Sequence, residues 1–361
     1  MIRYKLLVLP VLCLMIFMQS CVHGDLEECP PMVSYAVAFK YTNHTGTTDR
    51  FYDDVKKINL YVFDENNLIY TTTTELSPYD TNFNIPLDIP MGNYHIIAWG
   101  NVLDDQPFSV TPAEFVKGET TLGEARFILE RIAGNLSQSE LEKLFYGEIE
   151  AEIPLYVSRI DTMSLINDTK RVRVVLHWDH TGEVRETEDV IDYDEVQVSM
   201  KGSNAVYNFR NNFVETNNVT YKPYYFDYTG GILATGPERP GEMTVYYYSD
   251  AFTEVTNTCV YDFTILRMMT GSPVTLTIER KKKAVSDPYG LVTVDIIESF
   301  IHYFNENGFS TSDRQNLFDK HDYYRVDFYF NYDKLAGTYV TGGIKVLDWT
   351  VIKQPGTPGA D

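Results

Sequence analysis

The chain has 361 residues and a formal net charge of −21 at pH 7, from 30 basic and 51 acidic residues. This balance excludes a nucleic-acid binder, because neutralising phosphates requires a basic face. Aromatic residues make up 14% of the chain and favour half-buried strands, so we expect a mostly β protein. Its length exceeds what one hydrophobic core usually serves, which predicts two domains.

Residues 1–20 are predicted to be a cleaved signal peptide. Arg3 and Lys5 precede an apolar run over residues 6–18, and the small residue Ser20 precedes Cys21. This order is typical of a secretory signal, and the run is shorter than the about 20 residues that a membrane-spanning helix needs. Cys21 directly after a small residue resembles the lipobox of bacterial lipoproteins. The resemblance implies that Cys21 becomes the acylated first residue, carrying chains such as palmitate; the alternative is an ordinary signal in which Cys21 is coincidental.

Residues 21–32 are predicted to be a lipidated acidic tether. The segment contains Asp25, Glu27 and Glu28 and ends in Pro30 and Pro31, so it is solvated and stiff. An acidic cluster after the acylated cysteine also resembles the surface-export signal of Bacteroidales-type lipoproteins. The alternative is a plain charged linker.

The first half of the mature chain predicts an antiparallel β-sandwich over residues 33–155. Apolar and polar residues alternate with a period of two, and turn-forming residues separate the runs. The runs lie at residues 33–41, 58–63, 68–70, 83–89 and 94–100. No strand–helix rhythm indicates a parallel sheet. Trp99 has apolar neighbours on its strand, so we expect it in the core of this sandwich.

Residues 111–147 are predicted to form a short helical insertion. Thr111 and Pro112 resemble a helix cap with proline in the first turn, and residues 139–145 have the composition of one or two helical turns. A second sandwich is predicted over residues 156–353, and a flexible tail over residues 354–361.

Catalytic motifs are absent from the sequence, which predicts that the protein is not an enzyme and needs no cofactor. His177 and Asp179 share a strand face and could contribute to a metal site. A polar cap at a strand end is the favoured interpretation, because no third ligand can be named, so no metal is predicted. Cys29 and Cys259 are candidates for a disulfide in an oxidising compartment, although the sequence gives no assurance that their sulfurs meet.

Several segments in combination resemble the fimbrillin-associated anchor lipoproteins of Bacteroidales. They are residues 25–30 after Cys21, residues 60–65, 90–94 and 98–100, residues 144–147, residues 170–174 and residues 266–268. The resemblance spans nearly the whole chain. It implies two tandem transthyretin-like antiparallel β-sandwich domains, lipid attachment at Cys21 and a surface-exposed place on the outer membrane at the base of a fimbria, with pilin subunits as partners. Thr162, within Asp161-Thr162-Met163, also resembles the O-glycosylation site of exported proteins in these bacteria.

Three functional classes remain open from the sequence. The first is an outer-membrane anchor that attaches a fimbria and ends its elongation, the second a stalk or tip subunit that polymerises by strand exchange, and the third a surface glycan-binding lipoprotein. A polymerising subunit should lose its first strand by proteolysis and accept a neighbour's strand. Arg50 is the basic residue suitably placed for such a cleavage. An anchor should keep the strand, and residues 344–349 are then the candidate contact with the last pilin, although burial in the second sandwich is the simpler interpretation of this segment.

Overall fold

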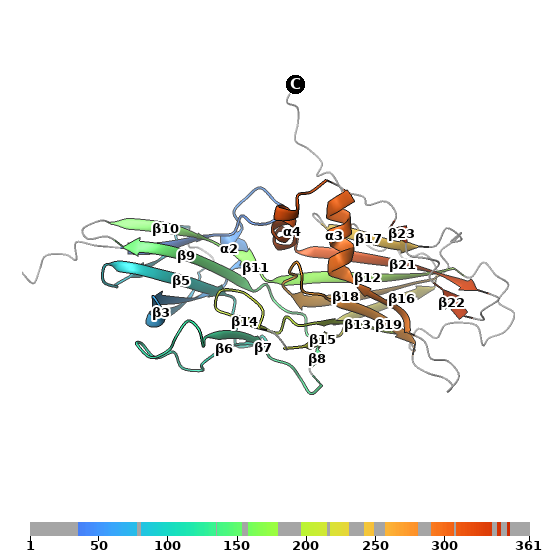
Figure 1. Cartoon of the computed structure of the whole chain (residues 1–361), viewed down its shortest axis with the longest axis horizontal. Helices are drawn as coiled ribbons and strands as arrows, with labels where there is room; N and C mark the ends of the chain where they lie inside the picture. The colour runs from blue at the N-terminus through green and yellow to red at the C-terminus, as the bar shows by residue number, and fades with distance from the viewer. Residues whose placement is uncertain are drawn as a thin grey trace, which may run out of the picture.

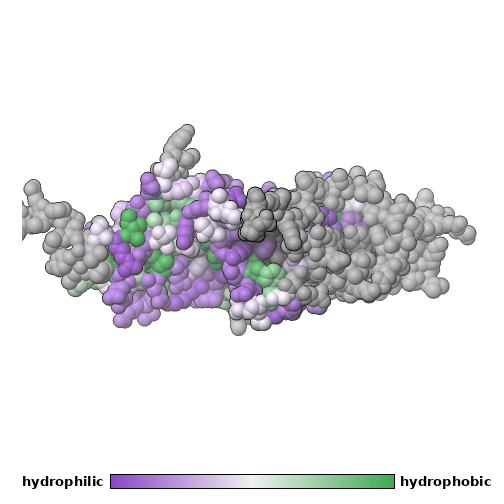
Figure 2. All heavy atoms as spheres, turned by 90° about the horizontal axis from the view of Figure 1, so that it is seen from above, coloured by the Kyte–Doolittle hydropathy of each residue, from purple (hydrophilic) through white to green (hydrophobic). Residues whose placement is uncertain are grey.

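The computed structural model describes residues 35–77, 81–134, 136–153, 158–179, 196–214, 217–230, 242–248, 257–280, 290–306, 308–333, 338–340 and 345–346. The molecule is elongated, with the strands of the N-terminal half at one end and those of the C-terminal half at the other (Figure 1). Seen from above, hydrophilic residues cover most of the described N-terminal half, with small hydrophobic patches between them (Figure 2).

Three sheets build the N-terminal half. Sheet A has the order β10 (Arg159–Ser164), β1 (Tyr35–Lys40) and β4 (Asn84–Leu87). Sheet B has the order β11 (Ile166–Asn167), β9 (Phe145–Ile153), β5 (Gly92–Gly100), β2 (Lys57–Asp64) and β3 (Asn67–Glu75). Sheet C has the order β14 (Val206–Asn208), β7 (Arg126–Leu129) and β6 (Phe108–Thr111). The short helix α2 (Phe51–Asp54) connects β1 to β2.

Sheet B is the middle layer, because both of its faces are buried. Successive side chains of a strand point to opposite faces. On β2, Ile58, Leu60 and Val62 belong to the hydrophobic cluster shared with sheet A, whereas Tyr61 and Phe63 belong to the cluster on the other face. A strand that is apolar at nearly every position therefore fits here, because a strand with one polar face would bury that face between two layers.

Two larger sheets and two helices build the C-terminal half. Sheet D has the order β20 (Gly290–Asp295), β19 (Thr275–Arg280), β13 (Val196–Gly202), β15 (Val219–Tyr221) and β8 (Leu136–Ser137). Sheet E has the order β16 (Tyr225–Gly230), β18 (Asn257–Leu266), β12 (Thr169–Asp179), β21 (Tyr323–Asp333), β17 (Glu242–Tyr248) and β23 (Lys345–Val346), with β22 (Thr338–Val340) paired to β21. The amphipathic helix α3 (Ile296–Glu306) packs Phe300 edge-on against Tyr324, and the 3-10 turn η3 (Thr311–Asp313) leads into α4 (Arg314–Lys320).

The two halves are joined through their sheets and share one core. Strand β14 from the C-terminal half completes sheet C, and β8 from the N-terminal half pairs with β15 in sheet D. Trp99 on β5 stacks on Phe127 with ring centroids 4.6 Å apart and also contacts Tyr207 and Phe209, which follow β13 in the chain. A single buried cluster runs from Trp99 through sheets D and E.

The predicted strands over residues 58–63 and 94–100 are confirmed as β2 and β5, the one over residues 33–41 is confirmed as β1 over residues 35–40, and Trp99 is fully buried. The predicted helical insertion is wrong. Residues 108–111 and 126–129 form β6 and β7, and residues 139–144 have no helix. Leu141 and Leu144 are both buried, but they lie in an irregular segment. Each reaches the core separately, so their helix-like spacing does not mark a helix. The described helices lie instead at α2, α3 and α4.

The expectation of antiparallel sheets is corrected in part. Strand β1 pairs in parallel with β10, and β21 pairs in parallel with both β12 and β17. These parallel partners are far apart in the sequence, so no local strand–helix rhythm marks them. Strands β10 and β11, which follow residue 155, pair within sheets A and B.

Candidate functional site: the first strand and the junction of the halves

Strand β1 is enclosed on both edges. All six of its residues have partners in the parallel strand β10, and Tyr35 to Ala38 also pair with the antiparallel strand β4. Its side chains Val37 and Phe39 are buried between sheets A and B. The alternating sequence thus forms a strand that lies in the middle of its sheet, with both edges occupied.

The segment after β1 is tied to distant parts of the chain. The buried ring of Tyr41 contacts Phe145 edge-on at 4.9 Å, and its hydroxyl donates to Asp322 in the C-terminal half at 3.2 Å. The Tyr41 N–H donates to Oδ1 of Asp49, and the Tyr41 carbonyl accepts from the N–H of Arg50. The end of β1 is therefore fixed both to the following loop and across the junction of the halves.

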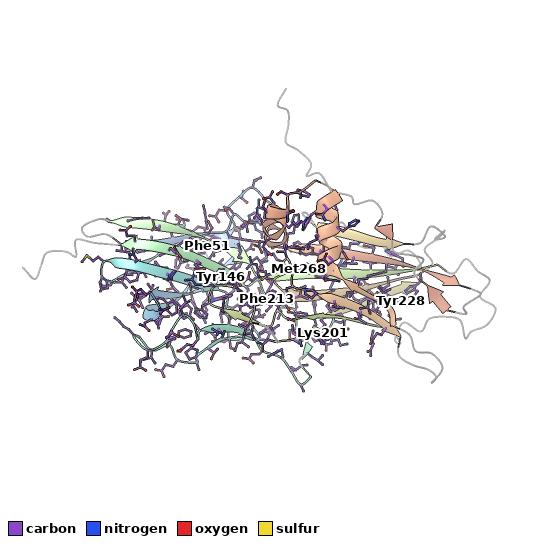
Figure 3. All side chains as sticks on the ribbon, viewed as in Figure 1. Phe51, Tyr146, Lys201, Phe213, Tyr228 and Met268 are labelled. Carbon is purple, nitrogen blue, oxygen red and sulfur yellow. The ribbon has the colours of Figure 1, made fainter. Side chains whose placement is uncertain are left out.

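The Arg50–Phe51 peptide bond lies at the start of α2 with both of its polar groups engaged. The Arg50 carbonyl accepts from the N–H groups of Asp53 and Asp54, and the Phe51 N–H donates to Oδ1 of Asp49 at 2.9 Å. The Phe51 side chain is fully buried and stacks on Phe39, with centroids 5.7 Å apart (Figure 3). A protease that reads Arg50 would have to unfold this turn before it could bind the bond in extended form.

A network of charged side chains joins the halves below β1. Arg267 forms two parallel hydrogen bonds to Asp319, each 2.7 Å long, and its Nε lies 3.8 Å from Asp168. Lys170 is fully buried and donates from Nζ to the backbone carbonyl of Asp319 at 3.0 Å. Lys143 from the N-terminal half lies 3.0 Å from Asp54 and 3.2 Å from Asp322. Four carboxylates, those of Asp54, Asp168, Asp319 and Asp322, therefore lie among four cations across this junction, because Arg50 also pairs with Asp54 at 2.9 Å.

Asp168 is the least compensated member of the network. It has no exposed surface, and neither of its carboxylate oxygens has a hydrogen-bond partner among the described residues. Burial raises the pKa of Asp168 from its usual value to about 7; Arg267 acts against this and Asp319 adds to it. Burial likewise lowers the pKa of the Lys170 ammonium, against the pull of Asp322. Protonation of Asp168 would remove a negative charge from this fully buried position.

We expect Asp168→Asn to stabilise the chain at pH 8 and to change little near pH 4. Because the folded pKa exceeds the unfolded one, the folded state binds the extra proton, so stability from this group is fully present below about pH 4 and is lost as the pH rises through about 7. Asparagine mimics the protonated form, so the difference at pH 8 should reach the order of a few kcal/mol. Urea titrations at both pH values measure it. An equal effect of the substitution at the two pH values would contradict the assignment.

The other residues singled out in the sequence lie apart from this junction. His177 is buried on β12, and its Nε2 lies 2.7 Å from Oδ1 of Asp327, which also pairs with Arg325. This is a polar ion-pair network, and among the described residues no group of three His, Cys, Asp or Glu side chains could hold a metal ion. Nothing in the sequence near His177 indicates Asp327 as its partner, because the parallel pairing of β12 with β21 creates the contact.

Cys259 lies on β18 with its thiol buried, which raises the pKa of that thiol to about 12, and Cys29 lies outside the described residues. Their disulfide therefore stays a prediction.

Thr162 is exposed on β10, beside Ala38 of β1. Cys21 lies outside the described residues, as do residues 344 and 347–349 of the candidate pilin contact. Within the described part of the chain, no helix is long and apolar enough to span a bilayer.

Solved structures with a similar fold come from Bacteroides and Porphyromonas species. A candidate adhesin from Bacteroides thetaiotaomicron matches with a TM-score of 0.65 and 20% identity, covering 90% of this chain and 98% of that one. A candidate polysaccharide-binding protein from the same organism matches with a TM-score of 0.63 and 20% identity, covering 88% and 98%. The fimbrial anchor protein Mfa2 from Porphyromonas gingivalis matches with a TM-score of 0.59 and 17% identity, covering 87% and 96%. No curated protein sequence matches the chain.

The family assignment rests on the sequence itself. The model of the family described as fimbrillin-A associated anchor proteins Mfa1 and Mfa2 matches residues 26–355. This match covers both halves and all five sheets, and it confirms the family predicted from the combined segments. The chain belongs to the fimbrillin-A associated anchor proteins.

Proposed function

We propose that this chain is a lipid-anchored subunit that holds a fimbria on the outer membrane and ends its elongation. The observation that carries the proposal is the enclosure of β1 between β10 and β4. A subunit that accepts a neighbour's strand needs an open strand edge or an empty strand position. Here every residue of β1 pairs with β10 and residues 35–38 also pair with β4, so no position is free for a neighbour beside these four residues.

The engaged Arg50–Phe51 bond supports retention of β1. We expect a trypsin-like protease to leave this bond intact in the folded chain, because cleavage requires the first turn of α2 and the buried Phe51 to open. Asp49→Ala removes the acceptor of both the Tyr41 and Phe51 N–H groups, so it should speed cleavage at Arg50 at least tenfold. Mass spectrometry of samples taken during the digestion identifies the cleaved bond. Equal cleavage rates in the unchanged chain and in Asp49→Ala would remove this support for the retention of β1.

Lipid attachment at Cys21 is the second part of the proposal. Its support is the signal-like N-terminus, since each buried methylene of an acyl chain contributes about 0.8 kcal/mol and two or more chains give stable retention. We expect Cys21→Ala to release the protein from the membrane fraction while the chain still folds. Fractionation with a matched Cys259→Ala control separates loss of the anchor from a general effect of removing a cysteine. Wild-type levels of the Cys21→Ala protein in outer membranes would contradict lipid anchoring.

The complete function is tested in cells by electron microscopy. A strain that lacks the chain should form fimbriae that are longer, shed into the medium, or both. A strain with Cys21→Ala should mainly shed fimbriae, because the chain still caps them but no longer holds them. Fimbriae of normal length attached to cells without the chain would refute the anchoring role. The polymerising alternative instead predicts shorter or missing fimbriae.

A further inference from the structure

Within the part of the chain that the structure describes, one edge of β13 has no strand neighbour along residues 196–198. β13 pairs with β19 from Val196 to Lys201, but with β15 only from Met200 to Gly202. After β15 the chain leaves sheet D, because Pro223 has no N–H and the N–H of Tyr224 donates to the carbonyl of Asp262 in sheet E. Among the described residues, no strand continues beside residues 196–198 on this side.

The backbone of β13 points into this gap. The N–H of Lys222 donates to the carbonyl of Ser137 on β8, so Lys222 faces away from β13. Because successive residues face opposite edges, Tyr221 faces β13, opposite Met200. The same alternation directs the N–H and C=O groups of Val198 and Val196 toward the gap, while Gln197 faces β19. An open strand edge of this kind is a template for another strand.

A cavity of about 360 Å³ occupies the gap. Val196 and Val198 line it from β13, Leu136 and Gln138 from the side of β8, and Phe226 and Tyr261 from sheet E. The Phe226 ring contacts Tyr261 at 4.8 Å, yet Phe226 is 41% exposed. Tyr228, two residues further on the same face of β16, is 39% exposed (Figure 3). The Phe226 side chain therefore lies at the cavity with part of its surface exposed.

Lys222 gives the cavity a charge. Its side chain is half-buried at the lining, and no described carboxylate lies within ion-pair distance of it. Its lining neighbours Gln138 and Gln197 are neutral. The chain has 51 acidic residues, yet none of the described ones pairs with the half-buried Lys222. A ligand in the gap is therefore favoured if it carries a negatively charged group.

We propose that this gap binds an extended polypeptide segment of a partner protein, which adds to β13 as a strand and pairs a carboxylate with Lys222. The N–H groups of Val196 and Val198 would donate to the added strand and their carbonyls would accept from it, and alternate apolar side chains would cover Phe226 and Tyr261. The strand-spaced donors and acceptors favour a polypeptide over a sugar, whose hydroxyls do not repeat at that spacing. The proposal does not depend on the anchoring function, because the gap lies in sheet D and not beside β1.

The test uses the exported chain and a random heptapeptide library with free C-terminal carboxylates. We expect selection of peptides with alternating β-branched or aromatic residues and saturable binding in titration calorimetry. N-methylation of the peptide amides should weaken binding at least tenfold, because the added strand pairs through its N–H groups. Lys222→Gln should weaken binding about tenfold, as expected for loss of a charge-assisted hydrogen bond. Gln138→Trp, which fills the cavity from an exposed position, should weaken it by at least as much.

The matched control is Lys201→Gln. Lys201 is an exposed lysine on the same strand, but it pairs opposite Thr220 and lies outside the gap, so binding should be unchanged (Figure 3). Circular dichroism of each variant checks that sheet D is intact. Failure to select any peptide, equal loss in Lys201→Gln and Lys222→Gln, or tolerance of N-methylation would overturn the proposal. Binding of oligoglucuronate in place of peptides would overturn it in favour of an acidic-sugar site.

Discussion

Replacing Trp99 with alanine is expected to destabilise the folded chain by about 3 to 5 kcal/mol, the range for truncating a buried aromatic side chain. Trp99 has no exposed surface and packs on Phe127, Tyr146, Tyr207 and Phe209. Two of these rings come from the C-terminal half, so the cavity would open at the point where the halves share their core. Urea unfolding of the whole chain measures the loss, because an isolated N-terminal fragment would lack Tyr207 and Phe209.

Trp99→Phe is the matched control. It keeps a ring against Phe127 and removes an indole N–H that has no hydrogen-bond partner among the described residues. We therefore expect it to cost much less than alanine, under about 1.5 kcal/mol. An unchanged unfolding midpoint in Trp99→Ala would mean that this side chain is not part of the core.

Replacing Arg267 with methionine is expected to cost about 3 to 5 kcal/mol, the range for removing one partner of a buried ion pair. Arg267 makes both hydrogen bonds to Asp319 and is the cation nearest to Asp168. Its loss leaves two carboxylates in a buried site with Lys170 alone close by. Adding Asp168→Asn should recover part of the loss, because one of the two charges is then removed. Urea unfolding of the two single variants and the double variant at pH 7 measures this coupling.

Arg159→Met tests whether the stability lost on removing an ion pair depends on the burial of the pair and not on its length. The Arg159–Asp161 pair is shorter, at 2.6 Å, but the Arg159 side chain is 46% exposed on β10. Solvent screens such a pair, so we expect little change in stability. A loss in Arg159→Met as large as that in Arg267→Met would show that the junction network has no special importance.

Local patterns predicted strands well where each strand has its own alternation. The spacing of Val37 and Phe39 predicted β1, and the apolar run from Ile58 to Phe63 predicted β2. The sequence could not show that β2 is buried on both faces, because that depends on sheet C, which takes β14 from the other half of the chain. Similarly, Leu141 and Leu144 have a helix-like spacing, but their burial comes from tertiary contacts and not from a helix.

The junction network could not be predicted either. Asp168, Arg267 and Asp319 are ordinary charged residues in the sequence, and they become a site only because β12, β18 and α4 meet. The gap beside β13 could not be predicted from the sequence for the same reason. Pro223 marks the end of β15, but only the crossing of the chain to sheet E leaves Val196 and Val198 without a described strand on the edge opposite β19.

The sequence by itself determined the mostly β class, the central strands, the burial of Trp99 and the family, because these depend on local alternation and on segments that match in order. The tertiary structure alone decided the enclosure of β1, the charged junction and the open edge of β13. Each of these depends on which distant strands become neighbours. Hydrogen bonding between β1 and β10 joins residues more than a hundred positions apart, and no periodicity within either segment encodes that pairing.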